Sequence, residues 1–312
     1  MKARRVSWVI MLTLVACSTP DRLHGESADP HAYPGFAPSS VLRQHNYRVD
    51  AQVRPFLFWM RKANIGDGRL TWRTGPDATV GYELLVGSDP GRAPRHINRW
   101  GYLREESGAG GAMVFGVMSH SDEQSIEQAD KNTRRSDRVH VFKALRQVVT
   151  GSQARVTVSD IRVSRDLTYA DLEPLLASVP AAPSTTKSVP LAEWSSPGFL
   201  TAAASLMEEG RRTAGKVSAS PRFVRVYPYN GMLYELQLRS ADRTDRGTSA
   251  ERSSGPAIQG RFRVLNRSTR DETLFTIVYG VEGDLAGVPL LISWRPRWWL
   301  EIQCVLHDED RE

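Results

Sequence analysis

The residues best suited to chemistry in this sequence lie in two stretches that interleave tryptophan with arginine. SWRPRWWL, residues 293–300, has three tryptophans within six residues, and RHINRWGYLREE, residues 95–106, has a similar mixture. Tryptophan offers a large apolar face, and the planar guanidinium of arginine holds acidic groups. The stretches therefore predict two walls of one site for an amphiphilic, acidic ligand such as a lipid or glycolipid. The candidate binding residues are Arg95, Arg99, Trp100, Tyr102 and Arg104 in the first wall and Trp294, Arg295, Arg297 and Trp299 in the second.

Two other interpretations of these stretches stay open. A core strand with an aromatic anchor at its entrance would explain the tryptophans at 294, 298 and 299 without any ligand. Alternatively, His96 with Glu105 or Glu106 could supply the acid and base of a hydrolase.

No recognised nucleophile motif supports the hydrolase. Ser184 and Lys187 have the Ser-x-x-Lys spacing of penicillin-binding proteins, but they lie in a proline-flanked stretch without the helix that this geometry needs. The histidines show neither His-x-His nor His-x-x-x-His spacing, and no cysteine pair could complete a zinc site. We therefore expect no catalytic residue, metal or cofactor, and we favour a non-enzymatic protein.

The start of the chain has the three-part pattern of a secretory signal. A basic stretch, residues 1–5, precedes an apolar run over residues 6–16, which is shorter than the roughly 20 residues that a spanning helix needs. Residues Leu14-Val15-Ala16-Cys17 resemble the lipobox of bacterial lipoproteins. The resemblance covers residues 1–18. It implies removal of residues 1–16 and attachment of acyl chains to Cys17.

Such a lipid anchor would place the protein in the cell envelope. Ser18, rather than an aspartate, follows the cysteine, which in Gram-negative lipoproteins implies the outer membrane, on its periplasmic or surface face. An ordinary signal peptide with a chance cysteine is the alternative. The membrane is thus the expected partner, reached through the acyl chains.

The net charge and the cysteine content bear on two further properties, nucleic-acid binding and disulfide bonding. Three basic residues of the +6 chain lie in the signal, which leaves the mature part near neutrality and predicts no nucleic-acid surface. Cys304 is the only cysteine besides Cys17, so we expect no disulfide. In WWLEIQCVLH, residues 298–307, apolar and polar residues alternate, which predicts a strand with Trp298 and Cys304 on its buried face.

Composition divides the chain into several segments. We expect a signal over residues 1–16, a flexible proline-rich tether over 17–40, a first β lobe over 41–176, a linker over 177–190, and a second β lobe over 191–312 that begins with a helix. Ser121 to Thr133 also has a helical pattern, and the second lobe's helix should have Ser196 as its cap and Pro197 at its first position.

Strand-like runs outnumber helical ones throughout. The fold class predicted is mainly β, with two antiparallel lobes, barrel- or sandwich-like, and a few short helices. Asn230-Gly231 predicts a type I′ hairpin turn. The stretches from Gly68 and Gly260 share a similar order of strands and turns, which raises the hypothesis of a duplicated module.

Three functional classes follow from this fold. The favoured one is an anchored, non-enzymatic lipoprotein that binds or carries an amphiphile, by architectural analogy with lipocalins and bacterial lipoprotein carriers. A periplasmic hydrolase of unknown substrate and a structural subunit of an envelope assembly are the alternatives.

Overall fold

The computed structural model describes most of the chain from residue 36 to residue 307. The described residues are 36, 39–54, 58–75, 79–94, 99–108, 111–118, 139–164, 171, 175, 179, 184–191, 193–214, 223–244 and 255–307. The signal, Cys17, Arg95, His96 and the predicted helix over Ser121 to Thr133 lie outside them.

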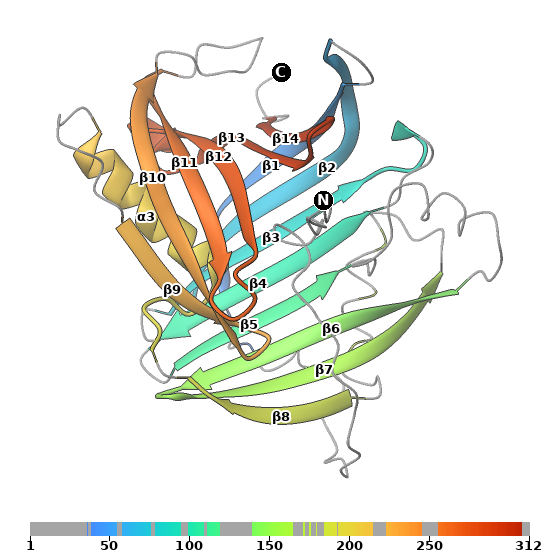
Figure 1. Ribbon diagram of the computed structural model, residues 1–312, viewed down its shortest axis with the longest axis vertical. Helices are drawn as coiled ribbons and strands as arrows, with labels where there is room; N and C mark the ends of the chain where they lie inside the picture. Colours follow the sequence, from blue (N-terminus) through green and yellow to red (C-terminus); the bar gives the residue numbers. More distant parts are fainter. Residues whose placement is uncertain are drawn as a thin grey trace, which may run out of the picture.

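Fourteen strands form the body of the protein (Figure 1). Those of the first half are β1 (Ser40–Val53), β2 (Met60–Thr74), β3 (Val80–Ser88), β4 (Trp100–Gly108), β5 (Gly111–Met118), β6 (Val139–Thr150), β7 (Gln153–Ser164) and β8 (Ser184–Pro190). Those of the second half are β9 (Phe223–Tyr229), β10 (Met232–Thr244), β11 (Ala257–Asn266), β12 (Glu272–Gly280), β13 (Pro289–Arg297) and β14 (Leu300–Leu306). The described helices are α3 (Phe199–Thr213) and the 3₁₀ turn η5 (Gly283–Leu285).

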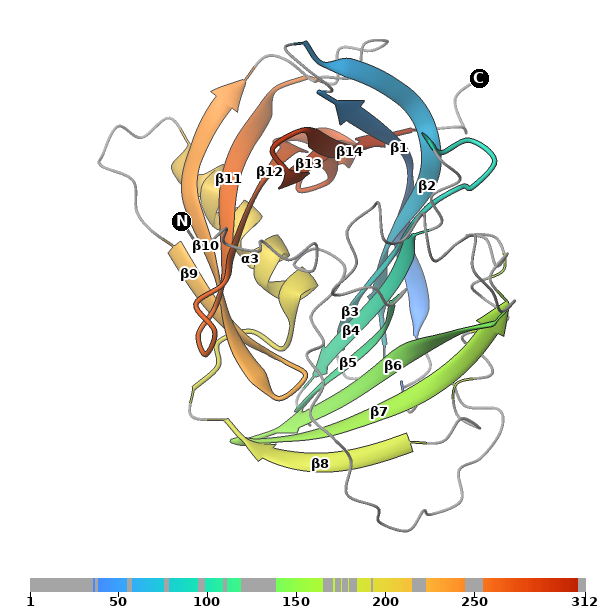
Figure 2. The same cartoon turned by 45° about the vertical axis from the view of Figure 1, so that its right-hand side comes forward.

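All these strands belong to one antiparallel sheet, in the order β8 to β1 followed by β14 to β9. The mainly antiparallel β class is therefore confirmed. The two predicted lobes, however, are halves of a single sheet, because β1 pairs with β14 from Tyr47↔Leu306 to Val53↔Leu300. This pairing satisfies backbone groups that two separate sheets would leave exposed at their edges. The sheet curves around α3 (Figure 2).

The predicted linker and tether both contribute to the sheet. Residues Ser184–Pro190, assigned to the linker by composition, form the edge strand β8 and pair with β7. The strand is almost entirely exposed, so its serine, threonine and lysine residues are typical of a solvated edge. Near the end of the predicted tether, Phe36 packs against the sheet and β1 begins at Ser40. The linker prediction was wrong for 184–190, and the tether ends before residue 40.

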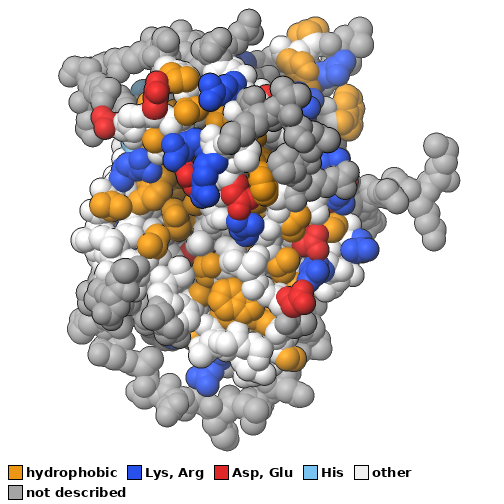
Figure 3. All heavy atoms as spheres, turned by 90° about the vertical axis from the view of Figure 1, so that its left-hand side faces the viewer, with side chains coloured by type: hydrophobic (Ala, Val, Ile, Leu, Met, Phe, Trp, Pro, Cys, Tyr) orange, Lys and Arg blue, Asp and Glu red, His pale blue; other side chains and the backbone are white. Residues whose placement is uncertain are grey.

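Helix α3 begins later than the sequence predicts. Its N-cap is Gly198, so Ser196 and Pro197 precede the helix instead of opening it. The buried residues recur at helical spacing on one face, and they are Leu200, Ala202, Ala203, Leu206, Met207 and Gly210. This face packs against β9, β10 and β11 and reaches β3. On the side of the molecule where α3 lies, charged and apolar side chains are interspersed (Figure 3).

Two hydrophobic clusters occupy opposite faces of the sheet. The helix core joins α3 to residues such as Val114, Leu145 and Tyr234. The outer core contains Phe115 and Ala144, the sequence neighbours of Val114 and Leu145. Because successive side chains of a strand point to opposite faces, the two clusters lie on either side of β5 and β6.

Strand alternation and turn chemistry predicted several local features correctly. Asn230 and Gly231 have φ values of 51° and 72°, as the predicted type I′ turn requires. Cys304 is buried on β14 and packs in a third cluster around β1 and β14.

The prediction for Trp298 was wrong. Trp298 is not on β14: it lies in the β13–β14 turn and is 71% exposed. The stretches from Gly68 and Gly260 form the hairpins β2–β3 and β11–β12.

Candidate functional site

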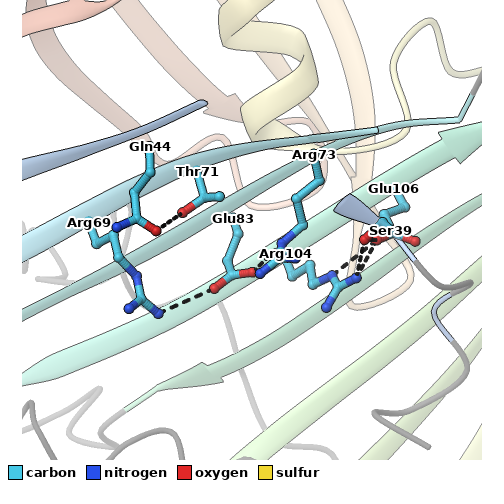
Figure 4. Close-up of polar contacts among 8 residues, drawn as sticks. All are labelled: Ser39, Gln44, Arg69, Thr71, Arg73, Glu83, Arg104 and Glu106. Atoms are coloured by element: carbon cyan, nitrogen blue, oxygen red, sulfur yellow. Dashed lines mark hydrogen bonds and ion pairs between the residues drawn. The ribbon is translucent and has the colours of Figure 1, made fainter. Parts of the chain in front are cut away.

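A row of arginine and glutamate side chains crosses β2, β3 and β4 on the face of the outer core. We call it the arginine row, and its members are Arg69, Arg73, Glu83, Arg104 and Glu106. Figure 4 shows them following one another across the three strands. Glu83 accepts from Arg73 Nε at 2.7 Å and lies 3.6 Å from Arg69 Nη2. One carboxylate thus serves two guanidinium groups.

Strand alternation brings these side chains to one face. Arg69, Thr71 and Arg73 are alternate residues of β2, and Thr71 lies opposite Glu83, which lies opposite Arg104. Gly81 leaves room in the row, because a Cβ at that position would lie 3.1 Å from Glu106 Cγ. The arrangement follows from the register of three strands that are consecutive in the sequence.

Arg104 and Glu106 form the most buried part of the row. Arg104 Nη2 donates to Glu106 at 2.5 Å and to the Ser39 hydroxyl at 3.0 Å, and its guanidinium lies 4.2 Å from the centre of the Phe36 ring. Burial opposes the charge of Arg104, but its hydrogen bonds and attraction to Glu106 raise the pKa above its ordinary value. At this end of the row, Arg104 and Glu106 form a buried ion pair.

The other end of the row is open to solvent. The side chains of Arg69 and Arg73 are 25% and 20% exposed, whereas Glu83 is buried beneath them. Within the row the guanidinium groups of Arg69, Arg73 and Arg104 lie beside the carboxylates of Glu83 and Glu106. Partly exposed guanidinium groups are suited to bind a carboxylate or phosphate.

A buried apolar cluster continues the row along the same strands. Leu85, Trp100 and Tyr102 alternate with the row's residues on β3 and β4 and belong to the outer core. Leu175 and Val179 pack on that core. The face therefore combines a partly exposed cationic strip with a packed aromatic core.

The first predicted wall lies partly in this site. Arg104 is a member of the row, and Trp100 and Tyr102 are buried beside it. Arg99 is half-buried just before β4, and burial lowers the pKa of its guanidinium. Sequence reasoning missed Arg69, Arg73 and Glu83. The alternation Arg-x-Thr-x-Arg on β2 was the signal that could have found them.

The second predicted wall does not face the first. Trp294 packs against the helix core, on the opposite face of the sheet from Trp100 and Tyr102. Strand β13 is also separated from β4 by β14, β1, β2 and β3. The prediction of one site between the two walls is therefore wrong, because strand order and alternation separate them.

The remaining residues of the second wall border the β13–β14 turn. Arg295 Nε donates to Glu301 at 2.6 Å, and its guanidinium lies 5.1 Å from the centre of the Trp59 ring. Trp299 is half-buried against the cluster around β1 and β14. The side chain of Arg297 lies outside the described part.

The carboxylates proposed for a hydrolase are both engaged in the fold. Glu105 is fully buried and accepts from the backbone N–H groups of Leu200 and Thr201 at 2.8 and 2.9 Å. These donors are the second and third residues of α3, so a carboxylate from β4 caps the helix. Burial raises the pKa of Glu105 to about 6, although these hydrogen bonds oppose the shift. Glu106 is paired with Arg104.

Ser184 and Lys187 do not have the geometry of a Ser-x-x-Lys nucleophile. Both lie on the exposed edge strand β8, where residues three apart point to opposite faces. Among the described residues there is no group of three or more histidine, cysteine, aspartate or glutamate side chains placed to hold a metal. No helix in the described part of the chain is long and apolar enough to cross a membrane.

Comparison with known proteins gives one structural similarity. No family model and no curated protein matches the chain. A crystal structure of a β-barrel-like protein with the domain of unknown function DUF1849, from Brucella abortus, is similar at a TM-score of 0.38 and 7% identity, over 85% of this chain and 96% of that one.

Proposed function

We propose that the protein is a non-enzymatic lipoprotein of the cell envelope that holds an acidic amphiphile at the arginine row. The observation that carries the proposal is the sharing of buried Glu83 between Arg69 and Arg73, whose side chains are 25% and 20% exposed. The acidic head group binds Arg69 and Arg73, whose planar guanidinium groups match a carboxylate or phosphate.

The charge of the site makes a specific demand on the ligand. A phosphate or carboxylate head accepts charge-assisted hydrogen bonds from Arg69 and Arg73, whereas an uncharged head accepts weaker ones. Hydrogen bonds to charged groups contribute about 1.5–3 kcal/mol each. The protein should therefore prefer dodecyl phosphate to dodecyl maltoside, which carries the same chain on an uncharged head.

Arg69→Ala is the sharpest variant for this test. Arg73 keeps its hydrogen bond to Glu83 in that variant, so the buried Glu83 carboxylate stays paired. The affinity for dodecyl phosphate, measured by the change in tryptophan fluorescence, should fall about tenfold or more. Binding of dodecyl maltoside should not change.

Helix α3 offers a matched control. Glu208 also holds two arginines, Arg211 at 2.8 Å and Arg212 at 3.1 Å, but on an exposed part of the helix. Arg212→Ala removes the same chemical group from the same kind of triad and should leave binding unchanged. If both variants lose dodecyl phosphate equally, or neither does, the arginine row is a structural ion pair and the proposal fails.

Anchoring by Cys17 is the second part of the proposal. The lipobox resemblance supports it, and the chain beyond it supplies no other cysteine than buried Cys304. Cys17→Ser, or globomycin treatment, should leave unprocessed precursor that incorporates no palmitate. Normal processing to a free, soluble product would contradict the anchor.

A further inference from the structure

Two neighbouring hairpin turns carry an unusual concentration of apolar side chains at one end of the sheet. We call this surface the aromatic tip, and its members are Phe58, Trp59, Met60, Trp298 and Trp299. Phe58, Met60 and Trp298 are 59%, 49% and 71% exposed. Exposing several large apolar side chains together opposes folding and solubility, so such a surface marks a contact site.

Specific contacts hold the two turns side by side. Val53, the last residue of β1, pairs with both Met60 and Leu300. The next backbone N–H, that of Arg54, donates to the Trp299 carbonyl at 2.7 Å. The Trp59 ring lies over the Arg295 guanidinium. The ends of β1 and β2 that carry the tip lie at the top of Figure 2.

Basic side chains surround the tip, and we call them the basic collar: Arg54, Arg61, Lys62 and Arg295. Arg61 pairs with Asp50 and Arg295 with Glu301, but both carboxylates are buried. The side chains of Arg61 and Arg295 are 45% and 62% exposed above them. The acidic partners thus lie beneath the surface, and the surface that meets solvent is basic.

We propose that the aromatic tip and its basic collar dock on the interface of an anionic lipid bilayer. Tryptophan prefers the head-group level of a bilayer, and lysine and arginine beside it attract anionic lipids. The partner is a lipid surface because the tip projects from two turns and its charge is of one sign. This contact uses different residues from the arginine row and does not depend on ligand binding there.

A lipid anchor at Cys17 is compatible with this contact. Strand β1 has 14 residues, so Ser40 and the tip are separated by at most about 45 Å. Residues 17–39 span at most about 80 Å when fully extended. An anchored protein can therefore place the tip on the membrane that holds its anchor.

The test places an environment-sensitive probe at the tip of the full-length protein. Trp298→Cys carries the fluorophore NBD, and Leu42→Cys is the control, because Leu42 has the same 71% exposure but lies near the tether. Both proteins are reconstituted in vesicles of phosphatidylcholine with phosphatidylglycerol, or of phosphatidylcholine alone. Lipids with spin-labelled acyl chains quench any probe that enters the bilayer.

The proposal predicts a blue-shifted, quenched probe at position 298 in anionic vesicles and an aqueous probe at position 42. Adding the substitution Lys62→Gln should lower the ratio of membrane-inserted tip to tip in water about fivefold. This is the effect expected from the loss of one basic residue near an anionic surface. Phe58→Ser should lower it further without altering the circular dichroism spectrum.

Three results would overturn the proposal. One is an aqueous probe at 298 in anionic vesicles, and another is quenching at 42 in place of 298, which would show that the tether end faces the bilayer. The third is a spectral shift in neutral vesicles that grows with the protein-to-lipid ratio, which would assign the tip to contact between copies of the chain.

Discussion

The Glu105 cap of helix α3 makes the stability of the protein depend on pH in a defined way. The perturbation is Glu105→Gln, which keeps the shape of the side chain but cannot ionise. In the wild type, burial raises the pKa of Glu105 to about 6, compared with an ordinary value of 4.5. The folded state therefore holds the proton more tightly than the unfolded state does.

The sign and size of the effect follow from these two values. Below pH 4.5 the carboxyl is protonated in both states, and above pH 6 it is ionised in both. Between them, ionisation destabilises the folded protein as the pH rises. At 1.36 kcal/mol per pH unit, the wild type loses about 2 kcal/mol of unfolding free energy across this window relative to the glutamine variant.

Chemical denaturation at several pH values between 4 and 7.5, followed by circular dichroism, measures this difference. The unfolding free energy of Glu105→Gln minus that of the wild type should rise by about 2 kcal/mol over this range. Glu282→Gln, which changes an exposed carboxylate, corrects for the change in net charge. If the unfolding free energies of Glu105→Gln and the wild type changed in parallel with pH, the helix N-terminus would fully offset the burial of Glu105. That result would refute the reasoning.

Three further predictions concern the same fold. Gly198→Ala should lower the unfolding free energy by about 1–3 kcal/mol in denaturation experiments, because its Cβ would lie 2.4 Å from the Glu105 carboxyl carbon; an unchanged midpoint would contradict the cap geometry. Cys304 should resist thiol reagents until the protein unfolds, since burial raises its pKa to about 12, and rapid labelling of native protein would contradict the register of β14. Trp298→Ala should change the unfolding free energy by less than about 0.5 kcal/mol, since the side chain is mostly exposed; a loss of several kcal/mol would place it in the core.

Local pattern was sufficient for the mainly β class, for the buried face of β14 and for one turn, but not for the edge strand β8. Alternation between apolar and polar residues determines which face of a strand is buried, so it predicted the buried position of Cys304. The Asn230-Gly231 turn depends only on two residues that tolerate positive φ. The end of a strand was less predictable, because alternation continued through Trp298 although β14 begins at Leu300.

The features that the sequence did not predict depend on contacts between distant residues. The pairing of β1 with β14 joins residues more than 240 positions apart, and no local pattern specifies that register. The start of α3 depends on a carboxylate from β4, which replaces the local Ser196 cap. The arginine row likewise becomes visible only when β2, β3 and β4 are placed side by side.

Native mass spectrometry of the protein purified from its own membrane tests the central claim most directly. Wild-type protein and Arg212→Ala should carry a bound species with an acidic head group, and Arg69→Ala should be folded but largely free of it. If wild-type protein carries no such species, or if Arg69→Ala retains it in full, the arginine row does not hold an acidic amphiphile.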